Sequence, residues 1–165
     1  MMEFRSILSF ETSFQFRHFD CGEANLNKYI RTHALLNDKN NLSKTFILLE
    51  DDSVIGFVTL CNAQIEFKDM PLDYQNNMPR YPVPAIRIAR LAIDKQYQHK
   101  GYGKKLLAFA FKKIVQVSQS TGIKVVLVDA KEESKAFYEK YGFIKLNDNT
   151  YIMAIETIIN ALLGL

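Results

Sequence analysis

Residues 98–103 read QHKGYG, and this short stretch decides the fold prediction. It lies between an alternating apolar segment, AIRIARLAID at 85–94, and a long amphipathic segment that begins at Gly103. Glycine has no Cβ, so a glycine pair lets backbone N–H groups converge on an anion. The start of the following helix adds unpaired N–H groups and the positive end of the helix dipole. The stretch therefore predicts a phosphate-binding loop at a strand-to-helix junction.

The charge distribution agrees with an anionic ligand near this loop. Residues 80–113 contain nine Lys or Arg and one acid, Asp94, a balance of +8, whereas the whole chain of 165 residues carries +3. The rest of the chain therefore sums to −5. A solvated helix face accounts for the four lysines at 104, 105, 112 and 113 taken alone, but the block as a whole favours an anionic partner.

Two common phosphate motifs do not match the loop. A P-loop, G-x-x-x-x-G-K-[ST], would need Gly at position 98 and Ser or Thr at 105, which are Gln98 and Lys105. A dinucleotide fingerprint, G-x-G-x-x-G, would need glycine at Leu106. The loop therefore belongs to neither class.

Apolar periodicity along the chain alternates between helix and strand signals and predicts one globular domain, residues 1–165. Asp20 is available as the cap of the first helix, and the helix after the loop is expected to bury Leu107, Phe111, Ile114 and Val117 or their near neighbours. Asp51-Asp52-Ser53 predicts a hairpin turn, and 69–84, with all four prolines, a loop. Helices are expected at 22–36, from 103 to about 119 and at 133–142, and strands at 45–50, 54–67, 85–94, 124–130 and 150–156.

The pattern [QR]-x-x-G-x-[GA] at 98–103, after a strand ending RLAID and before a long helix, resembles the acetyl-coenzyme A site of the GNAT acetyltransferases. A second stretch, AFYEKYGF at 136–143, is similar to the late helix of that family. Motif and context together are more specific than either alone. The resemblance implies an α/β (α+β) GNAT fold, with a central mixed, mostly antiparallel sheet flanked by helices.

The resemblance also implies roles for particular residues. Backbone amides of the loop would bind the pyrophosphate of coenzyme A, and the main chain of the preceding strand would bind the pantetheine arm and the thioester carbonyl. Tyr138 would be the general acid that protonates the departing thiolate, although Tyr138, Phe137 and Tyr141 fit core packing equally well on residues alone. The implied cofactor-binding residues are Leu91, Ala92, Ile93, Gln98, His99, Lys100, Gly101, Tyr102, Gly103 and Lys104.

Two further stretches, FDCGEANLNKYI at 19–30 and RYPVP at 80–84, resemble the GNAT toxins of bacterial toxin–antitoxin pairs. These toxins acetylate the amino group of an aminoacyl-tRNA, which stops translation. An α-amino group has a pKa of about 7.7 to 8.0, so it needs little help from a base, and no residue stands out as one. Among the basic residues, the candidates for RNA contacts are Lys28, Arg31, Arg80, Arg87 and Arg90.

Three functions remain open from the sequence. The first is an aminoacyl-tRNA acetylating toxin, with a ribbon-helix-helix antitoxin as a possible partner. The second is a GNAT enzyme that acetylates a small amine or a protein amine, and the third is a non-catalytic coenzyme A-binding module. An intact loop and Tyr138 argue against the third.

The remaining features set expectations about location and assembly. No export signal, membrane span or cysteine-based metal or disulfide motif is found, so a cytoplasmic protein without a metal is expected. The apolar segment TIINALLGL at 157–165 either packs against the first strands or forms a homodimer contact.

Overall fold

The computed structural model describes residues 1–163, except for the side chain of Ser13. It divides into two compact units, and each is described by itself. The first contains residues 1–61 and 89–110, and the second contains residues 62–88 and the chain from Phe111 onward. Within the described residues, no helix is long and apolar enough to cross a membrane.

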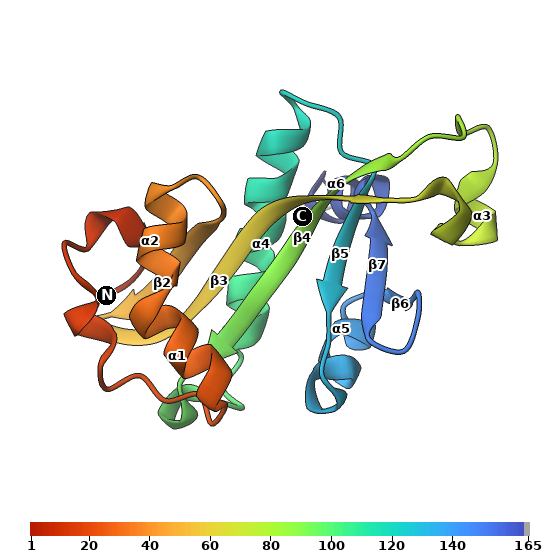
Figure 1. The fold of residues 1–165 in the computed structure, drawn as a ribbon. Coiled ribbons are helices and arrows are strands. Elements are labelled where there is room, and N and C mark those ends of the chain that lie inside the picture. Colours follow the sequence, from red (N-terminus) through yellow and green to blue (C-terminus); the bar gives the residue numbers. More distant parts are fainter. Residues whose placement is uncertain (164–165) are drawn as a thin grey trace. The chain divides into compact units, whose positions relative to one another are not determined.

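The strands form one sheet with the order β1-β2-β3-β4-β5-β7-β6, and Figure 1 shows the elements in chain order. Pairing is parallel between β4 and β5 and antiparallel for β1–β2, β2–β3, β5–β7 and β6–β7. The predicted mixed, mostly antiparallel sheet is confirmed. The strands are β1 (Met2–Ser6), β2 (Lys44–Glu50), β3 (Ser53–Ile65), β4 (Val83–Ile93), β5 (Val125–Asp129), β6 (Ile144–Lys145) and β7 (Thr150–Ala154).

Helices and 3-10 turns connect these strands. The α-helices are α1 (Ala24–Thr32), α2 (Ala34–Lys39), α3 (Leu72–Gln75), α4 (Tyr102–Ser118), α5 (Lys135–Lys140) and α6 (Ile155–Leu163). The 3-10 turns are η1 (Ile7–Ser9), η2 (Ser13–Phe16), η3 (Phe67–Asp69), η4 (Lys95–Tyr97) and η5 (Glu132–Ser134). The prediction that the whole of 69–84 is a loop was wrong where α3 and the first two residues of β4, Val83 and Pro84, lie inside it, and Asp69 ends η3.

The β2–β3 hairpin confirms the predicted antiparallel pair. Glu50 faces Ser53 in the register, and Asp51 and Asp52 form the turn with φ of 48° and 67°. Two successive left-handed residues are the signature of a turn whose twist matches that of the strands, and aspartate tolerates this conformation better than most residues.

The single helix predicted at 22–36 is divided at His33 into α1 and α2. The hydroxyl of Thr32 donates to the carbonyl of Lys28 at 2.7 Å, a bond that competes with regular helix geometry and bends the helix. His33 follows with φ −119° and ends α1. The expected cap was also wrong, because Glu23 occupies the N-cap without a side-chain bond and Asp20 bonds elsewhere.

Helix α4 begins and ends within one residue of its predicted bounds. Its buried side chains are Leu106, Leu107, Ala110 and Ile114. Leu107 and Ile114 are buried as expected, and Ala110 is the buried near neighbour of Phe111, which is half-buried. Val117, in the last turn, is 39% exposed.

Each unit has its own apolar core. In the first unit, a core cluster joins η1 and η2, α1, β2 and β3, with Phe16, Ile47 and Phe57 fully buried. In the second unit, a core cluster contains Val125, Leu127 and Ile152 from the adjacent strands β5 and β7. The four apolar residues of β5, 125–128, are all buried, which matches the prediction of a strand with both faces covered, and the strand ends at the exposed Asp129.

The carboxyl-terminal segment is helical. In α6, which contacts β7, the backbone N–H of Ile155 donates to the carbonyl of Lys124 at 3.0 Å, Ile158 is buried and Leu163 is 79% exposed. Residues 164 and 165 of the predicted apolar segment lie outside the described residues. The dimer contact stays a prediction.

Candidate functional site

The predicted phosphate loop is an irregular backbone segment between β4 and α4. Two of its residues have left-handed conformations, His99 with φ 62° and Gly101 with φ 88°. A Cβ added to Gly101 would meet nothing within 4 Å, so the need for glycine there is conformational and not steric. Gly103 lies in α4, so the two left-handed positions of the loop are His99 and Gly101 and not the two glycines.

The start of α4 is the part of the loop that can bind an anion. The amide of Lys105 donates to the carbonyl of Gly101 at 3.4 Å, and the amides before it, of Tyr102, Gly103 and Lys104, precede the regular helix ladder. Lys100 and Lys104 are exposed beside them. These features fit a diphosphate, which backbone amides and a helix dipole attract without any side-chain ligand.

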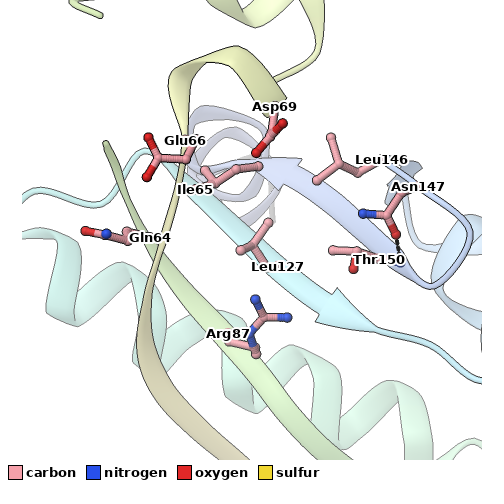
Figure 2. A pocket seen from close by; sticks show the side chains of 9 residues that line it. All are labelled: Gln64, Ile65, Glu66, Asp69, Arg87, Leu127, Leu146, Asn147 and Thr150. Atoms are coloured by element: carbon pink, nitrogen blue, oxygen red, sulfur yellow. Dashed lines mark hydrogen bonds between the residues drawn. The ribbon is translucent and has the colours of Figure 1, made fainter. Parts of the chain in front are cut away.

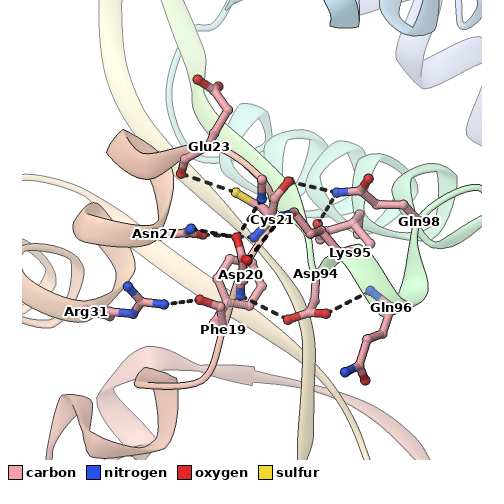
Figure 3. Close-up of polar contacts among 12 residues, drawn as sticks. Phe19, Asp20, Cys21, Glu23, Asn27, Arg31, Asp94, Lys95, Gln96 and Gln98 are labelled. Carbon is pink, nitrogen blue, oxygen red and sulfur yellow. Dashed lines mark hydrogen bonds and ion pairs between the residues drawn. The ribbon is translucent and has the colours of Figure 1, made fainter.

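Gln98 is held by protein groups on both of its side-chain N–H bonds. Its Nε2 donates to the carbonyl of Cys21 at 2.9 Å and to the carbonyl of Ile93 at 2.8 Å (Figure 3). A primary amide has two donors, so none is left for a phosphate. The side chain of Gln98 is therefore not a cofactor ligand as predicted, and its backbone N–H already donates to the carbonyl of Lys95 at 3.5 Å.

Asp94, at the end of β4, is bonded through both carboxylate oxygens to backbone amides. Oδ1 accepts from Gln96 at 2.9 Å, and Oδ2 accepts from Asp20 at 3.0 Å. The backbone amide of Asp94 itself donates to the carbonyl of Ile55 at 2.8 Å. These bonds make Asp94 a structural acceptor.

Asp20 is the centre of the same cluster. Its Oδ1 accepts from the side-chain amide of Asn27 and from the backbone of Gly22, both at 2.9 Å, and Lys95 Nζ lies 3.3 Å from Oδ2. These bonds, that from Asn27 first, lower the pKa of the Asp20 carboxyl below its usual range. Sequence reasoning missed Asn27, whose only visible signal was an asparagine at an inward helical position.

The end of β4 supplies the other predicted cofactor-binding residues. Ala92 is buried, while Leu91 and Ile93 are half-buried. The neighbouring strand approaches closely, because a Cβ added to Gly56 would lie 2.4 Å from the carbonyl oxygen of Ala92. Gly56 therefore fixes the position of the main chain that is expected to face the pantetheine arm.

Tyr138 lies in α5 of the second unit and is 5% exposed. Its ring contacts Phe137 and Phe143 edge to face, with centroids 5.1 and 5.5 Å away. Burial raises the pKa of the phenol well above its usual value, which keeps the proton on the oxygen.

The predicted RNA contacts differ in how far their charges are engaged. Lys28 and Arg80 are exposed, whereas the Arg31 guanidinium donates to the carbonyls of Phe16 and Phe19. The Cζ of Arg90 lies 3.7 Å from the ring centroid of Tyr29, a cation–π contact. Arg31 and Arg90 are thus partly committed inside the first unit.

Arg87 lines a pocket of about 420 Å³ in the second unit (Figure 2). Its Nη1 donates to Asp129 Oδ1 at 2.6 Å, and the same oxygen accepts from the hydroxyl of Thr150 at 3.1 Å. Asp129 is therefore the acidic partner of Arg87. The pocket is lined by Gln64, Ile65, Glu66, Asp69, Arg87, Leu127, Leu146, Asn147 and Thr150.

Metal chemistry has no support in the described part of the chain, where no group of three or more His, Cys, Asp or Glu side chains could hold an ion. Neither Cys21 nor Cys61 forms a disulfide within the described residues. The arrangement instead offers an anion-binding loop and a buried, protonated phenol.

Comparison with known proteins agrees with this chemistry. The model of a family described as an acetyltransferase (GNAT) domain matches residues 41–145. A tRNA-acetylating toxin of Mycobacterium tuberculosis is 36% identical over 148 residues, which is 88% of this chain and 89% of that protein.

Two solved structures of the protein AtaT match nearly the whole chain. AtaT complexed with acetyl-methionyl-tRNAfMet is 27% identical, with a TM-score of 0.88 over 98% of this chain and 99% of that one. A tyrosine-to-phenylalanine mutant of the AtaT toxin, bound to acetyl-CoA and the C-terminus of the antitoxin AtaR, is 25% identical, with a TM-score of 0.82 over 98% of both chains.

The fold and the loop together define an N-acetyltransferase. The chain belongs to the GNAT acetyltransferase family, and acetyl-coenzyme A is its acetyl donor. The fold, the enzyme class and the acetyl donor implied by the sequence are thereby confirmed.

Proposed function

We propose that this enzyme transfers the acetyl group of acetyl-coenzyme A to the α-amino group of an aminoacyl-tRNA and so acts as a toxin that blocks translation. The observation that carries the proposal is the 36% identity to a tRNA-acetylating toxin over 88% of the chain. A neutral acetylated amine can no longer serve as the nucleophile in peptide-bond formation, which explains toxicity in chemical terms.

The donor is bound in this proposal by the loop and by the end of β4. The amides of residues 98–104 bind the diphosphate, with Lys100 and Lys104 adding positive charge. The main chain of Leu91, Ala92 and Ile93 lies along the pantetheine arm. One amide there donates to the thioester carbonyl and stabilises the oxyanion, an effect typically worth about 3 kcal/mol.

The reaction needs two proton transfers. The neutral α-amine attacks the thioester carbon and forms the new C–N bond, and its extra proton passes to water. The C–S bond then breaks, and Tyr138 donates its phenolic proton to the departing thiolate. Burial raises the pKa of Tyr138, so the phenol still carries its proton when the thiolate leaves.

The exposed basic residues give the RNA contacts. Lys28 and Arg80 are the best candidates for phosphates, since the charges of Arg31, Arg87 and Arg90 are already engaged by protein groups. Contacts of this kind give affinity without sequence recognition. An antitoxin partner fits the same proposal, because AtaT is known with its antitoxin AtaR bound. A ribbon-helix-helix protein is the class that we expect, and a homodimer stays possible.

One observation favours a second candidate, acetylation of a small amine. The 420 Å³ pocket is within the size range of small-molecule sites, and Glu66 and Asp69 line it with no ion-pair partner among the described residues. Two carboxylates can receive an ammonium group.

Acetyl transfer to defined acceptors separates the two candidates. Purified enzyme is incubated with labelled acetyl-coenzyme A and either charged tRNA, the same tRNA after deacylation, or a panel of small amines. The toxin proposal predicts label on charged tRNA alone, and growth arrest on induced expression. Label on a small amine with none on charged tRNA, together with unimpaired growth, would refute it.

A further inference from the structure

Gln98 sits in the loop that we assign to the diphosphate, yet its side chain bonds away from any ligand. Both N–H bonds of Nε2 end on carbonyls, of Cys21 and Ile93. What remains is Oε1, an acceptor, which a phosphate oxygen would repel. A residue at the start of the loop therefore serves to hold the loop and not to bind the anion.

The backbone of Cys21, which accepts from Gln98, is itself bonded to a second amide side chain, that of Asn27. Asn27 in α1 is buried, with its Oδ1 accepting from the backbone of Cys21 at 2.9 Å and its Nδ2 donating to Asp20. The carbonyl of Asp20 accepts from the backbone of Lys95 at 2.8 Å, and the amide of Asp20 donates to Asp94. One connected cluster thus runs from α1, through residues 20–22, to both ends of η4 (Figure 3).

The loop needs such support because part of its backbone is unfavourable by itself. His99 has φ 62°, a left-handed conformation that costs a residue with a Cβ roughly 1 kcal/mol or more. The side chain of His99 is exposed, and Lys100 Nζ donates to the carbonyl of Gln96 at 3.0 Å, so the bonds of Gln98 and Lys100 hold the backbone on both sides of His99. A loop that is already in its binding conformation loses less entropy when it binds.

We infer that Asn27 and Gln98 are positioning residues for acetyl-coenzyme A: they lock residues 20–22 to the loop and so preset its amides for the diphosphate. The inference rests on the proposed assignment of residues 98–104 to the donor. It places a determinant of donor affinity in α1, outside the loop.

The test compares matched amide substitutions by calorimetric titration with acetyl-coenzyme A. Asn27→Asp replaces a donor with a carboxylate facing that of Asp20, and Gln98→Met removes both donors at similar length. Their controls are Asn25→Asp, the same change at an exposed position of the same helix, and Gln96→Met, an exposed glutamine of η4. The expected Kd rises about tenfold or more for Asn27→Asp and Gln98→Met and stays within about twofold for the controls.

A double-mutant cycle separates positioning from direct contact. If both residues act through one cluster, the Kd of the double variant for acetyl-coenzyme A is hardly higher than that of the single variant with the higher Kd. In steady-state kinetics the KM for acetyl-coenzyme A rises while kcat at saturation is kept. In an NMR titration, the affinity for S-acetylpantetheine, which lacks the diphosphate, is expected to be unchanged. A general loss of structure would lower this affinity as well.

Each result bears on the inference in a defined way. An unchanged Kd for Asn27→Asp, or single effects that multiply in the double variant, would overturn it. If Asn27→Asp lowers the thermal midpoint so far that it cannot be titrated, Asn27→Ala takes its place in the cycle. A wild-type protein that fails to bind acetyl-coenzyme A would instead refute the proposed function, which is a separate outcome.

Discussion

The polar groups around the diphosphate loop and those around the Arg87 pocket are organised in opposite ways. Near the loop, the side chains of Asn27, Asp94 and Gln98 turn inward and bond main-chain or neighbouring groups. In the pocket, Arg87 is paired with Asp129, but Glu66 and Asp69 have no ion-pair partner in the part of the chain that the structure describes.

This difference agrees with the roles that we propose for the two regions. A ligand bound through backbone amides needs no free side chain, only a fixed backbone, so the side chains around the loop serve as supports. A pocket that recognises its ligand through side chains must leave some of those side chains without a partner in the protein. The first region is therefore suited to a constant group such as a diphosphate, and the second to a variable one.

The largest expected effect removes the proton donor of the second unit. Tyr138→Phe keeps the buried ring and removes one oxygen, so kcat should fall about 100-fold or more while the thermal midpoint stays near that of the wild type. Tyr141→Phe, a partly buried neighbour, serves as the control. A Tyr138→Phe enzyme with the wild-type rate would show that Tyr138 only packs.

The dependence of the rate on pH is the second effect. The raised pKa of Tyr138 keeps the phenol protonated throughout the neutral and mildly alkaline range, so loss of this proton gives no decline there. The neutral fraction of an α-amine with a pKa of about 7.7 to 8.0 falls tenfold per pH unit below that value. We expect kcat/KM to rise through pH 7 and level off above pH 8, and a fall between pH 8 and 9 would contradict the role of Tyr138.

Two glycines of the first unit should differ in what alanine does. Gly56→Ala places a Cβ 2.4 Å from the Ala92 carbonyl, a backbone atom that cannot easily move, and should destabilise the fold by about 1–3 kcal/mol. Gly101→Ala meets no atom and costs only the conformational penalty, about 1 kcal/mol. Denaturant unfolding measures both, and equal losses would show that the Gly56 contact relaxes.

The smallest effect concerns exposed charge on α1. Lys28→Ala should weaken binding of charged tRNA a few-fold. It should also reduce the slope of log K against log[salt] by the amount expected for the loss of about one phosphate contact. Lys39→Ala in α2 is the matched control. Equal losses for both variants would indicate a diffuse field in place of a contact at Lys28.

The sequence predicted the structural features that depend on residues close together in the chain. Alternating side chains gave the strand at 85–94, and the glycines with the following amphipathic pattern gave the loop and α4 within a residue. The hairpin at Asp51 and Asp52 was equally local. The resemblance of the two motifs to one family then supplied the enzyme class, which the family match confirms.

The features that the sequence did not predict depend on contacts between distant residues. Gln98 and Cys21 are 77 positions apart, and Arg87 and Asp129 are 42 apart, so no local pattern reports either bond. Periodicity also could not show that Thr32 bonds back to Lys28 and divides the first helix. For the same reason Arg31, which resembles a free basic residue, was not recognised as a donor to two carbonyls.

The most direct test is mass spectrometry of the 3′ ends of charged tRNA. Total aminoacyl-tRNA is incubated with the enzyme and acetyl-coenzyme A and then cut by a ribonuclease that releases aminoacyl-adenosine. The account predicts a mass increase of one acetyl group on the α-nitrogen of at least one aminoacyl species, absent with Tyr138→Phe. Aminoacyl-adenosines of unchanged mass, from an enzyme that binds acetyl-coenzyme A, would contradict it.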